Sequence, residues 1–291
     1  MILKDIAGDE GAGWMRIGCH LSIAKGYAAA VKVAPTLGAN AFQYFTKNPR
    51  GFRNAKPLDR VDAERGRALL EELDLVAVGH TPYLINLAAA DESLYHASID
   101  ALVQDLVIAE ARGTYGVVVH CGKPKEQGHE WGIERMQQAI RVVLERNQTV
   151  GVRILVENTA GQGSEIGSNL AEILAIVEPF STDEVGICLD TQHAFASGML
   201  TKQDPTAFAG FDHPDFMKRL HAIHLNDSKV EFGAKKDRHE LIGQGILGLD
   251  AIQKLVNDPR LDAIPFYLET PVEKESQYAD EIAKVRSLIG H

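Results

Sequence analysis

Residues that can bind a metal ion or carry a proton stand at or beside the ends of seven short apolar segments of this 291-residue chain. Each segment has the length and composition of a strand that is buried on both faces. Parallel strands all point the same way, so their carboxyl ends meet at one edge of the sheet. The sequence therefore predicts that seven side chains lie close together. In chain order they are His20, His80, His120, Glu157, Asp190, His224 and Glu269.

The segments between these strands favour helices that pack on a parallel sheet. We expect strands at 16–21, 41–45, 75–80, 116–121, 153–157, 185–190, 221–225 and 265–269. Amphipathic stretches at 24–37, 62–73, 91–111, 131–146, 169–177, 212–220, 249–256 and 278–289 predict the helices. Regular alternation to the end of the chain favours a closed (β/α)8 TIM barrel, whose active site lies at the carboxyl ends of the strands. We expect one such domain at 15–291, preceded by a polar extension at 1–14.

Composition excludes several classes of protein. The chain is 45% hydrophobic and 24% charged, which is typical of a globular protein. No apolar stretch approaches the length of a membrane span. Cys19, Cys121 and Cys188 are odd in number and far apart, which favours reduced thiols in a cytoplasmic protein. A formal net charge of −10 argues against a protein that coats nucleic acid by bulk electrostatics.

Two further motifs supply candidate metal ligands. Asp190 and His193 are three residues apart just beyond a strand, so they can face different ions. Asp237 and His239 are two apart in an expected extended segment, which places both side chains on one face. His20 is expected either to bind a metal or to orient a ligand. Imidazoles and carboxylates suit zinc, manganese or iron(II), and clustered divalent ions are typical of phosphodiester hydrolysis. The nine candidate ligands are His80, His120, Glu157, Asp190, His193, His224, Asp237, His239 and Glu269.

Longer motifs of this chain resemble those of endonuclease IV (deoxyribonuclease IV), a family of zinc-dependent apurinic/apyrimidinic endonucleases that fold as a (β/α)8 barrel. The resemblance extends from about Met15 to Ala283 and is carried by VENTAGQG, LDTQHAFASG and DRHELIGQG, with GCHLSIAKG, FTKNPR, HTPYLINLA and HLNDSK. It implies three zinc ions. The first would be held by His80, His120 and Glu157; the second would share Glu157 and add Asp190, His224 and Glu269; the third would be held by His193, Asp237 and His239.

The same resemblance implies hydrolysis of the phosphodiester on the 5′ side of an abasic site in duplex DNA, leaving a 3′-hydroxyl and a 5′-deoxyribose phosphate. Glu157 and Glu269 would be catalytic, because they would hold the attacking hydroxide in place. Arg50, Tyr83 and Leu84 would enter the minor groove and fill the gap left by the missing base. We also expect a monomer that acts on nucleoid DNA. The residues expected to contact phosphates are Lys47, Arg50, Arg53, Lys56, Lys229, Lys235, Lys236 and Arg238.

Two other classes of function are open at this point. A sugar isomerase or epimerase of the xylose-isomerase-like barrels would share the fold and use one or two metal ions. Such an enzyme would have no use for a third ligand set built from His193, Asp237 and His239. A module that binds damaged DNA without cutting it would not need both Glu157 and Glu269. The presence of all five residues therefore favours a nuclease.

Overall fold

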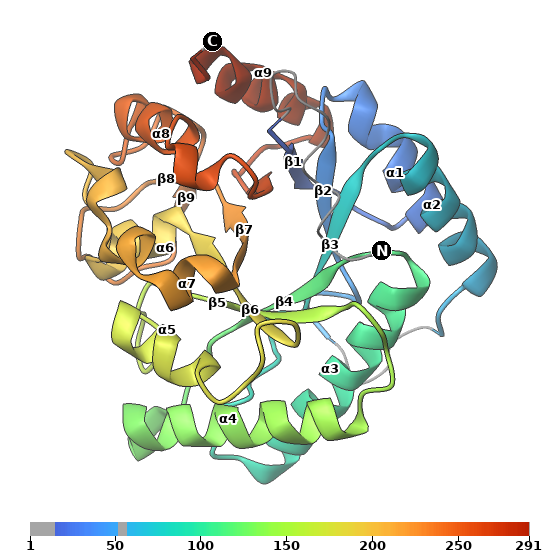
Figure 1. Cartoon of the computed structure of the whole chain (residues 1–291), viewed down its shortest axis with the longest axis vertical. Helices are drawn as coiled ribbons and strands as arrows, with labels where there is room; N and C mark the ends of the chain where they lie inside the picture. The colour runs from blue at the N-terminus through green and yellow to red at the C-terminus, as the bar shows by residue number, and fades with distance from the viewer. Residues whose placement is uncertain (1–14, 52–56, 291) are drawn as a thin grey trace.

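A computed structural model of the chain describes residues 15–51 and 57–290. In this part of the chain, eight parallel strands close into a barrel in the order β1-β10-β7-β6-β5-β4-β3-β2, and the helices surround them (Figure 1). The predicted (β/α)8 fold class is confirmed. The barrel strands are β1 (Ile17–His20), β2 (Ala41–Phe45), β3 (Val76–His80), β4 (Gly116–His120), β5 (Arg153–Glu157), β6 (Val185–Asp190), β7 (Leu220–His224) and β10 (Phe266–Leu268).

Some sequence predictions lie outside the described residues. They concern the extension at 1–14 and the phosphate contacts of Arg53 and Lys56. The division of the chain into an extension and one barrel domain therefore stays a prediction.

All eight segments predicted to be helical contain a helix, and three of these helices begin at the side chain of an Asp or Asn. Asp59, Asp91 and Asn169 each accept a hydrogen bond from the backbone N–H three residues later, which satisfies one free donor of the first turn. The helices are α1 (Tyr27–Thr36), α2 (Arg60–Glu72), α3 (Glu92–Ala111), α4 (His129–Arg146), α5 (Leu170–Val177), α7 (Pro214–Arg219), α8 (Leu249–Val256) and α9 (Tyr278–Leu288).

A further helix, α6 (Thr191–Ser197), follows β6 directly and was not predicted. Asp190 caps it by accepting a hydrogen bond from the N–H of His193 at 2.7 Å. Residues 191–196 are all buried, so the segment lacks the polar face that marks a surface helix. This turn of helix sets Asp190 and His193 at a fixed spacing.

Two layers of side chains fill the space on either side of the strands. Outside the barrel, apolar residues of the strands pack against the helices. Inside it, seven residues from seven strands form what we call the interior layer: Ala41, Val78, Val118, Leu155, Cys188, Ala222 and Tyr267. Side chains alternate along a strand, so the next inward position is two residues further on. That position faces the carboxyl-end mouth of the barrel.

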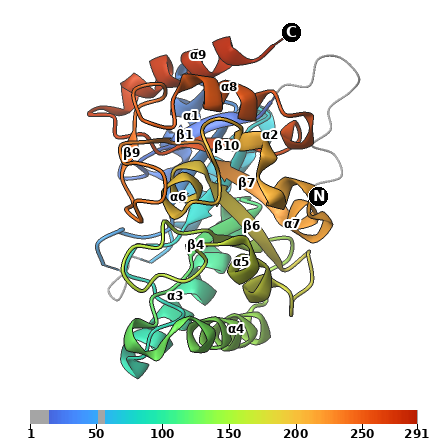
Figure 2. The same cartoon turned by 90° about the vertical axis from the view of Figure 1, so that its left-hand side faces the viewer.

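The long connection after β7 forms a small hairpin over one side of this mouth. Its strands β8 (Asp227–Ser228) and β9 (His239–Glu240) pair antiparallel, and β9 lies on the left of Figure 2. The carboxylate of Asp227 is buried and accepts hydrogen bonds from the N–H groups of Gly243, Gly245 and Gly248 at 2.9–3.0 Å. Asp227 thereby ties the loop after β9 back to β8. None of the helices in the described residues is long and apolar enough to cross a membrane.

Candidate metal centre

Chemically active side chains form one layer at the mouth of the barrel. Each of seven lies two residues beyond a member of the interior layer, and His20 joins them from β1. We call this set the mouth layer: His20, Gln43, His80, His120, Glu157, Asp190, His224 and Glu269. The alternation of side chains thus brings together residues that are far apart in the chain. Three groups of potential ligands lie within it and beside it.

Glu157 lies at the centre of this arrangement and is fully buried. Its Oε2 is 3.2 Å from Nε2 of His80 and 3.1 Å from Nε2 of His120. Its Oε1 is 2.9 Å from Nδ1 of His224. Burial alone would raise the pKa of Glu157, but His120 and His224 hold it well below its usual range. The two oxygens therefore face two different ligand groups, as a carboxylate that bridges two cations would.

A second group surrounds His224. Nδ1 of His224 is 3.1 Å from Oε2 of Glu269 and 3.9 Å from Oδ2 of Asp190. Asn226, just beyond β7, braces both carboxyl residues: its Nδ2 donates to Oδ2 of Asp190 at 2.7 Å, and its Oδ1 accepts from the N–H of Glu269 at 2.9 Å. Ligand atoms of Glu157, Asp190, His224 and Glu269 all lie within 4.8 Å of one another.

In the third group, ligand atoms of Asp190, His193 and His239 all lie within 4.8 Å of one another. Asp237, from the hairpin after β7, lies beside this group. Oδ1 of Asp237 is 3.4 Å from Nε2 of His193 and 3.5 Å from Nε2 of His239. Nε2 of His239 is also 3.5 Å from Oδ2 of Asp190, which links this group to the second. Asp237 is the most accessible member, with 44% of its side chain exposed. Asp237 and His239 face the same side, as their spacing predicted.

The hydrogen bonds made by the histidine rings show that the centre fits cations. Nδ1 of His80, of His193 and of His239 each lies 2.7–3.2 Å from a backbone carbonyl, to which it donates. Their Nε2 atoms point at carboxylate oxygens and are the nitrogens that a cation would bind in place of a proton. Nε2 of His193 and of His239 is buried and has no hydrogen-bond partner. Buried polar atoms are rarely left unpaired, and a cation between imidazole and carboxylate would satisfy both.

The charge of the centre supports the same conclusion. Four carboxylates converge here, from Glu157, Asp190, Asp237 and Glu269. Burial disfavours a charged His193, yet Asp190 and Asp237 raise its pKa well above the ordinary value. Burial likewise opposes the charge on Glu269, but His224 holds its pKa at about 2. The raised pKa of His193 reports the negative potential of these carboxylates, and that potential would attract divalent cations.

The residues expected to enter DNA lie on the rim of this mouth. Tyr83 and Leu84 follow β3, and their exposed fractions are 62% and 52%. The ring of Tyr83 is 5.0 Å from that of Phe45 and 6.1 Å from that of His120, so it stands directly beside the metal centre. Arg50 is exposed in the turn after β2. An exposed aromatic–aliphatic pair thus adjoins the cluster of ligands.

Cationic side chains gather on the opposite rim, around the hairpin after β7. Lys229, Lys235, Lys236 and Arg238 are exposed and line one shallow surface hollow together with Gln162. Their position beside Asp237 agrees with the phosphate contacts expected of them, which stay a prediction.

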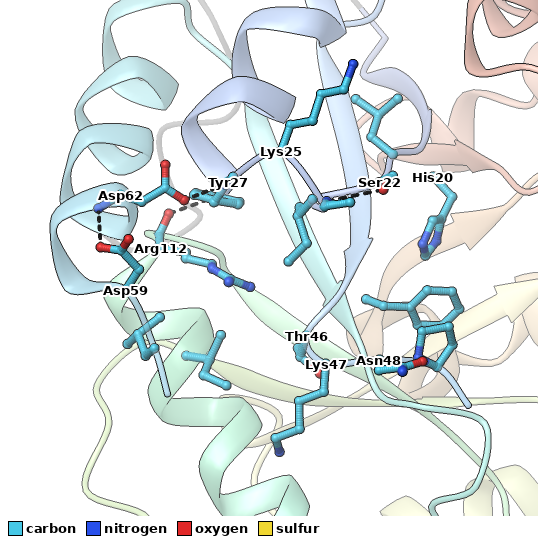
Figure 3. A pocket seen from close by; sticks show the side chains of 18 of the residues that line it. His20, Ser22, Lys25, Tyr27, Thr46, Lys47, Asn48, Asp59, Asp62 and Arg112 are labelled. Atoms are coloured by element: carbon cyan, nitrogen blue, oxygen red, sulfur yellow. Dashed lines mark hydrogen bonds between the residues drawn. The ribbon is translucent and has the colours of Figure 1, made fainter. Parts of the chain in front are cut away.

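Lys47 does not lie where the sequence indicated. Its ammonium is buried, 2.8 Å from Oδ1 of Asp105, and donates to the carbonyl of Ala101 at 2.7 Å. Both partners belong to α3, and the lysine side chain runs toward that helix at the floor of a cavity beside β2 (Figure 3). This burial disagrees with the phosphate contact expected of Lys47, because its ammonium pairs with Asp105 inside the protein. We propose no phosphate contact for Lys47.

Sequence reasoning missed the amides that hold the ligands. Asn226 braces Asp190 and Glu269, and Asn158 pairs with the backbone N–H and carbonyl of Asp190 through both ends of its amide. Gln43 contacts three members of the mouth layer. All three amides are fully buried. Gln43 lies in an otherwise apolar strand, and Asn158 and Asn226 lie within two residues of candidate ligands. A polar amide inside a predicted buried strand, as in AFQYF, is the signal that could have revealed Gln43.

Comparison with known proteins places this arrangement in a family. The model of the xylose isomerase-like TIM barrel family matches residues 31–288. A probable endonuclease 4 from Symbiobacterium thermophilum is 44% identical over 277 residues, which cover 94% of this chain and all of the relative. The chain belongs to the endonuclease IV family. The resemblance seen in its motifs is thereby confirmed.

Solved structures agree with this assignment. Endonuclease IV from Thermus thermophilus is 36% identical, with a TM-score of 0.83 over 94% of this chain and 98% of that one. More distant barrels match in fold alone. One is a 3-keto-D-glucoside 4-epimerase from E. coli, which is 16% identical with a TM-score of 0.67 over 94% of this chain and all of that one. Within this barrel superfamily, the chain is therefore more similar to endonuclease IV than to the epimerase.

Proposed function

We propose that this protein is an abasic-site endonuclease. It would hydrolyse the phosphodiester on the 5′ side of an abasic site in duplex DNA and leave a 3′-hydroxyl and a 5′-deoxyribose phosphate. The observation that carries the proposal is the convergence of nine ligands at a barrel mouth, beside the exposed pair Tyr83 and Leu84. The family relation to endonuclease IV supports it.

The centre would hold three zinc ions, with manganese or iron(II) possible at some positions. His80, His120 and Glu157 would hold the first; Glu157, Asp190, His224 and Glu269 the second; His193, Asp237 and His239 the third. Divalent ions in such a cluster would polarise the phosphodiester and activate water at neutral pH. Three charges of +2 would also move the formal net charge from −10 to −4.

Two carboxylates would have different tasks in this centre. Glu157 is fully buried and faces ligands on both sides, so it would mainly hold the centre together. The side chain of Glu269 is 15% exposed, at the open side of the mouth. Its carboxylate, kept ionised with a pKa of about 2, would orient the attacking water and accept its hydrogen bond. We therefore assign the more direct catalytic role to Glu269.

Recognition of the lesion would depend on shape rather than on base contacts. An abasic nucleotide lacks stacking and pairing, so turning it out of the helix costs little free energy. Tyr83 and Leu84 would occupy the gap, and Arg50 would enter the minor groove beside them. Arg238 and its neighbouring lysines would contact phosphates. We propose that the protein acts as a monomer on chromosomal DNA in the cytoplasm.

A sugar isomerase or epimerase is the alternative, because related barrels catalyse such reactions. The third ligand group argues against it. Proton or hydride transfer on a sugar does not call for an additional ion at His193 and Asp237, on the exposed side of the centre. Nor does it call for cationic residues on both rims of the mouth.

The test is incision of a duplex that contains a single tetrahydrofuran abasic analogue. Protein loaded with zinc, with metal content measured on the same sample, should cut on the 5′ side of the analogue and leave the undamaged duplex intact. Protein treated with a chelator should not cut, and zinc should restore cutting. Absence of incision at full zinc occupancy would overturn the nuclease proposal.

A further inference from the structure

Gln43 occupies the place in the mouth layer that β2 contributes. It lies two residues beyond Ala41 of the interior layer, on the same face of the strand, and its side chain is fully buried. The seven other strands contribute a histidine or a carboxylate at this level. Gln43 is the one amide in the layer among the described residues, and it has no role in the ligand groups described above.

The amide of Gln43 makes three hydrogen bonds, each to a different strand end. Its Nε2 donates to Oε1 of Glu269 at 2.6 Å. Its Oε1 lies 2.8 Å from Nε2 of His224. Its Nε2 also lies 3.1 Å from Nδ1 of His20. Both N–H groups and the carbonyl oxygen are therefore used, and the three partners come from β10, β7 and β1.

The chemistry of these partners fixes the direction of every hydrogen bond. An ionised carboxylate only accepts, so the amide nitrogen must face Glu269 and the carbonyl must face His224. A carbonyl only accepts as well, so Nε2 of His224 must carry the proton. Nδ1 of His224 faces Oε1 of Glu157 at 2.9 Å and Oε2 of Glu269 at 3.1 Å. A proton on Nδ1 bridges to these carboxylates, and a cation that displaced this proton would bind the same nitrogen. The tautomer set by Gln43 is the one that can bind a metal.

We infer that Gln43 is a positioning residue for the second ligand group: it holds His224 in the metal-binding tautomer and orients the carboxylate of Glu269. This inference rests on the proposed metal centre, to which Gln43 contributes no ligand atom. Groups that hydrogen-bond to metal ligands typically change metal affinity by about 10- to 100-fold when removed. The amide also fixes the tautomer of His20, because Nδ1 of His20 accepts from Gln43 and the ring proton is then on Nε2.

Two substitutions separate the parts of this role. Gln43→Met keeps a side chain of similar length but removes all three hydrogen bonds. Gln43→Glu retains an acceptor for His224 but loses the donor to Glu269 and places two carboxylates together. Gln137→Met is the matched control, because Gln137 on α4 donates to the carbonyl of Ala175 and contacts no ligand. All three proteins should first be compared in thermal unfolding with zinc bound, to confirm that they fold.

The tautomer can be read directly from the nitrogen chemical shifts of His224 in protein labelled with 15N histidine. In the zinc-loaded wild-type protein, His224 should show a single form, in which Nε2 carries the proton and Nδ1 carries none. In Gln43→Met the two forms should be mixed, while His80 and His193, which donate to backbone carbonyls, should be unchanged. An unchanged single tautomer of His224 in Gln43→Met would overturn the assignment.

Zinc affinity provides the second measurement. In competition with a chelating dye, Gln43→Met should bind its most weakly held ion about 10- to 100-fold more weakly than wild type, and Gln137→Met should match wild type. In Gln43→Glu, the His224 tautomer should persist while zinc affinity falls, because the acceptor for His224 remains but the donor to Glu269 is lost. Wild-type zinc affinity in a folded Gln43→Met protein would contradict the inference. Neither readout uses DNA, so failure of the endonuclease proposal leaves both outcomes decisive for Gln43.

Discussion

The ammonium of Lys47 lies 2.8 Å from the carboxylate of Asp105, and neither side chain has more than 2% of its surface exposed. This ion pair joins the start of the loop after β2, which carries Arg50, to the middle of α3. Burial raises the pKa of Asp105 and Lys47 opposes that shift. The pair therefore anchors the loop that carries Arg50 to α3.

We predict that Lys47→Met destabilises the protein by about 3–5 kcal/mol, because it leaves the charge of Asp105 buried without a partner. Urea unfolding of the zinc-loaded protein measures this loss. The double substitution Lys47→Met with Asp105→Leu should recover most of it, since no buried charge then remains. A single variant within about 1 kcal/mol of wild type would show that the pair is not buried in solution.

Glu269→Gln should reduce the rate of incision at least about 100-fold, which corresponds to about 2.7 kcal/mol of activation free energy. The amide keeps the shape of the side chain but removes the negative charge that orients water. Single-turnover kinetics on the tetrahydrofuran duplex, with zinc content measured in parallel, checks this. Binding of the damaged duplex should persist. Incision at the wild-type rate would remove Glu269 from the mechanism.

Arg50→Ala should weaken binding of abasic DNA without changing zinc content, because its side chain is exposed on the rim and belongs to none of the ligand groups. If the guanidinium contacts a phosphate, the slope of log affinity against log salt should also fall by about one. Arg146→Ala is the control, since Arg146 ends α4 and pairs with Asp100 on the outer surface. Loss of zinc from Arg50→Ala would mean that the loop supports the metal centre instead.

The metal-free protein should be most stable between about pH 4.5 and pH 6.5. Asp190 and Asp237 raise the folded-state pKa of His193 well above 6.5 against the effect of burial. A raised pKa gives stability that is present below 6.5 and is lost as the pH rises through the folded-state value. For Glu269 burial is outweighed by His224, so its folded-state pKa of about 2 gives stability that is present above 4.5 and is lost as the pH falls toward 2.

Zinc should reverse the loss on the alkaline side, because it takes the place of the protons on the histidines. The increase in Tm on adding zinc should therefore be larger at about pH 8 than at about pH 5.5. Thermal unfolding with a chelator and with excess zinc, in matched buffers, provides the comparison. An equal or smaller zinc effect at the higher pH would contradict the proposed ligand set.

The barrel could be predicted from the sequence because the patterns that indicate its strands and helices are local in the chain. Each strand is a short apolar run and each intervening helix has an apolar face, and both patterns can be seen within a few residues. The convergence of the candidate ligands at the strand ends could be predicted for the same reason, since the ends of parallel strands meet whatever the details of packing. The α6 helix was missed because it is buried on all sides and has no polar face.

Only the tertiary structure decided which residues that are distant in the chain contact one another. Closure of the barrel places β1 beside β10, and so brings Gln43 within 2.6 Å of Glu269 across 226 residues of sequence. The same folding turns Lys47 inward to Asp105, although its motif indicates a surface cation. The residue types at the mouth follow from the sequence, whereas the hydrogen bonds that orient them depend on the closed barrel. The physical reason is that a side chain's periodicity is set by its own strand, but its charge state and contacts are set by its neighbours in space.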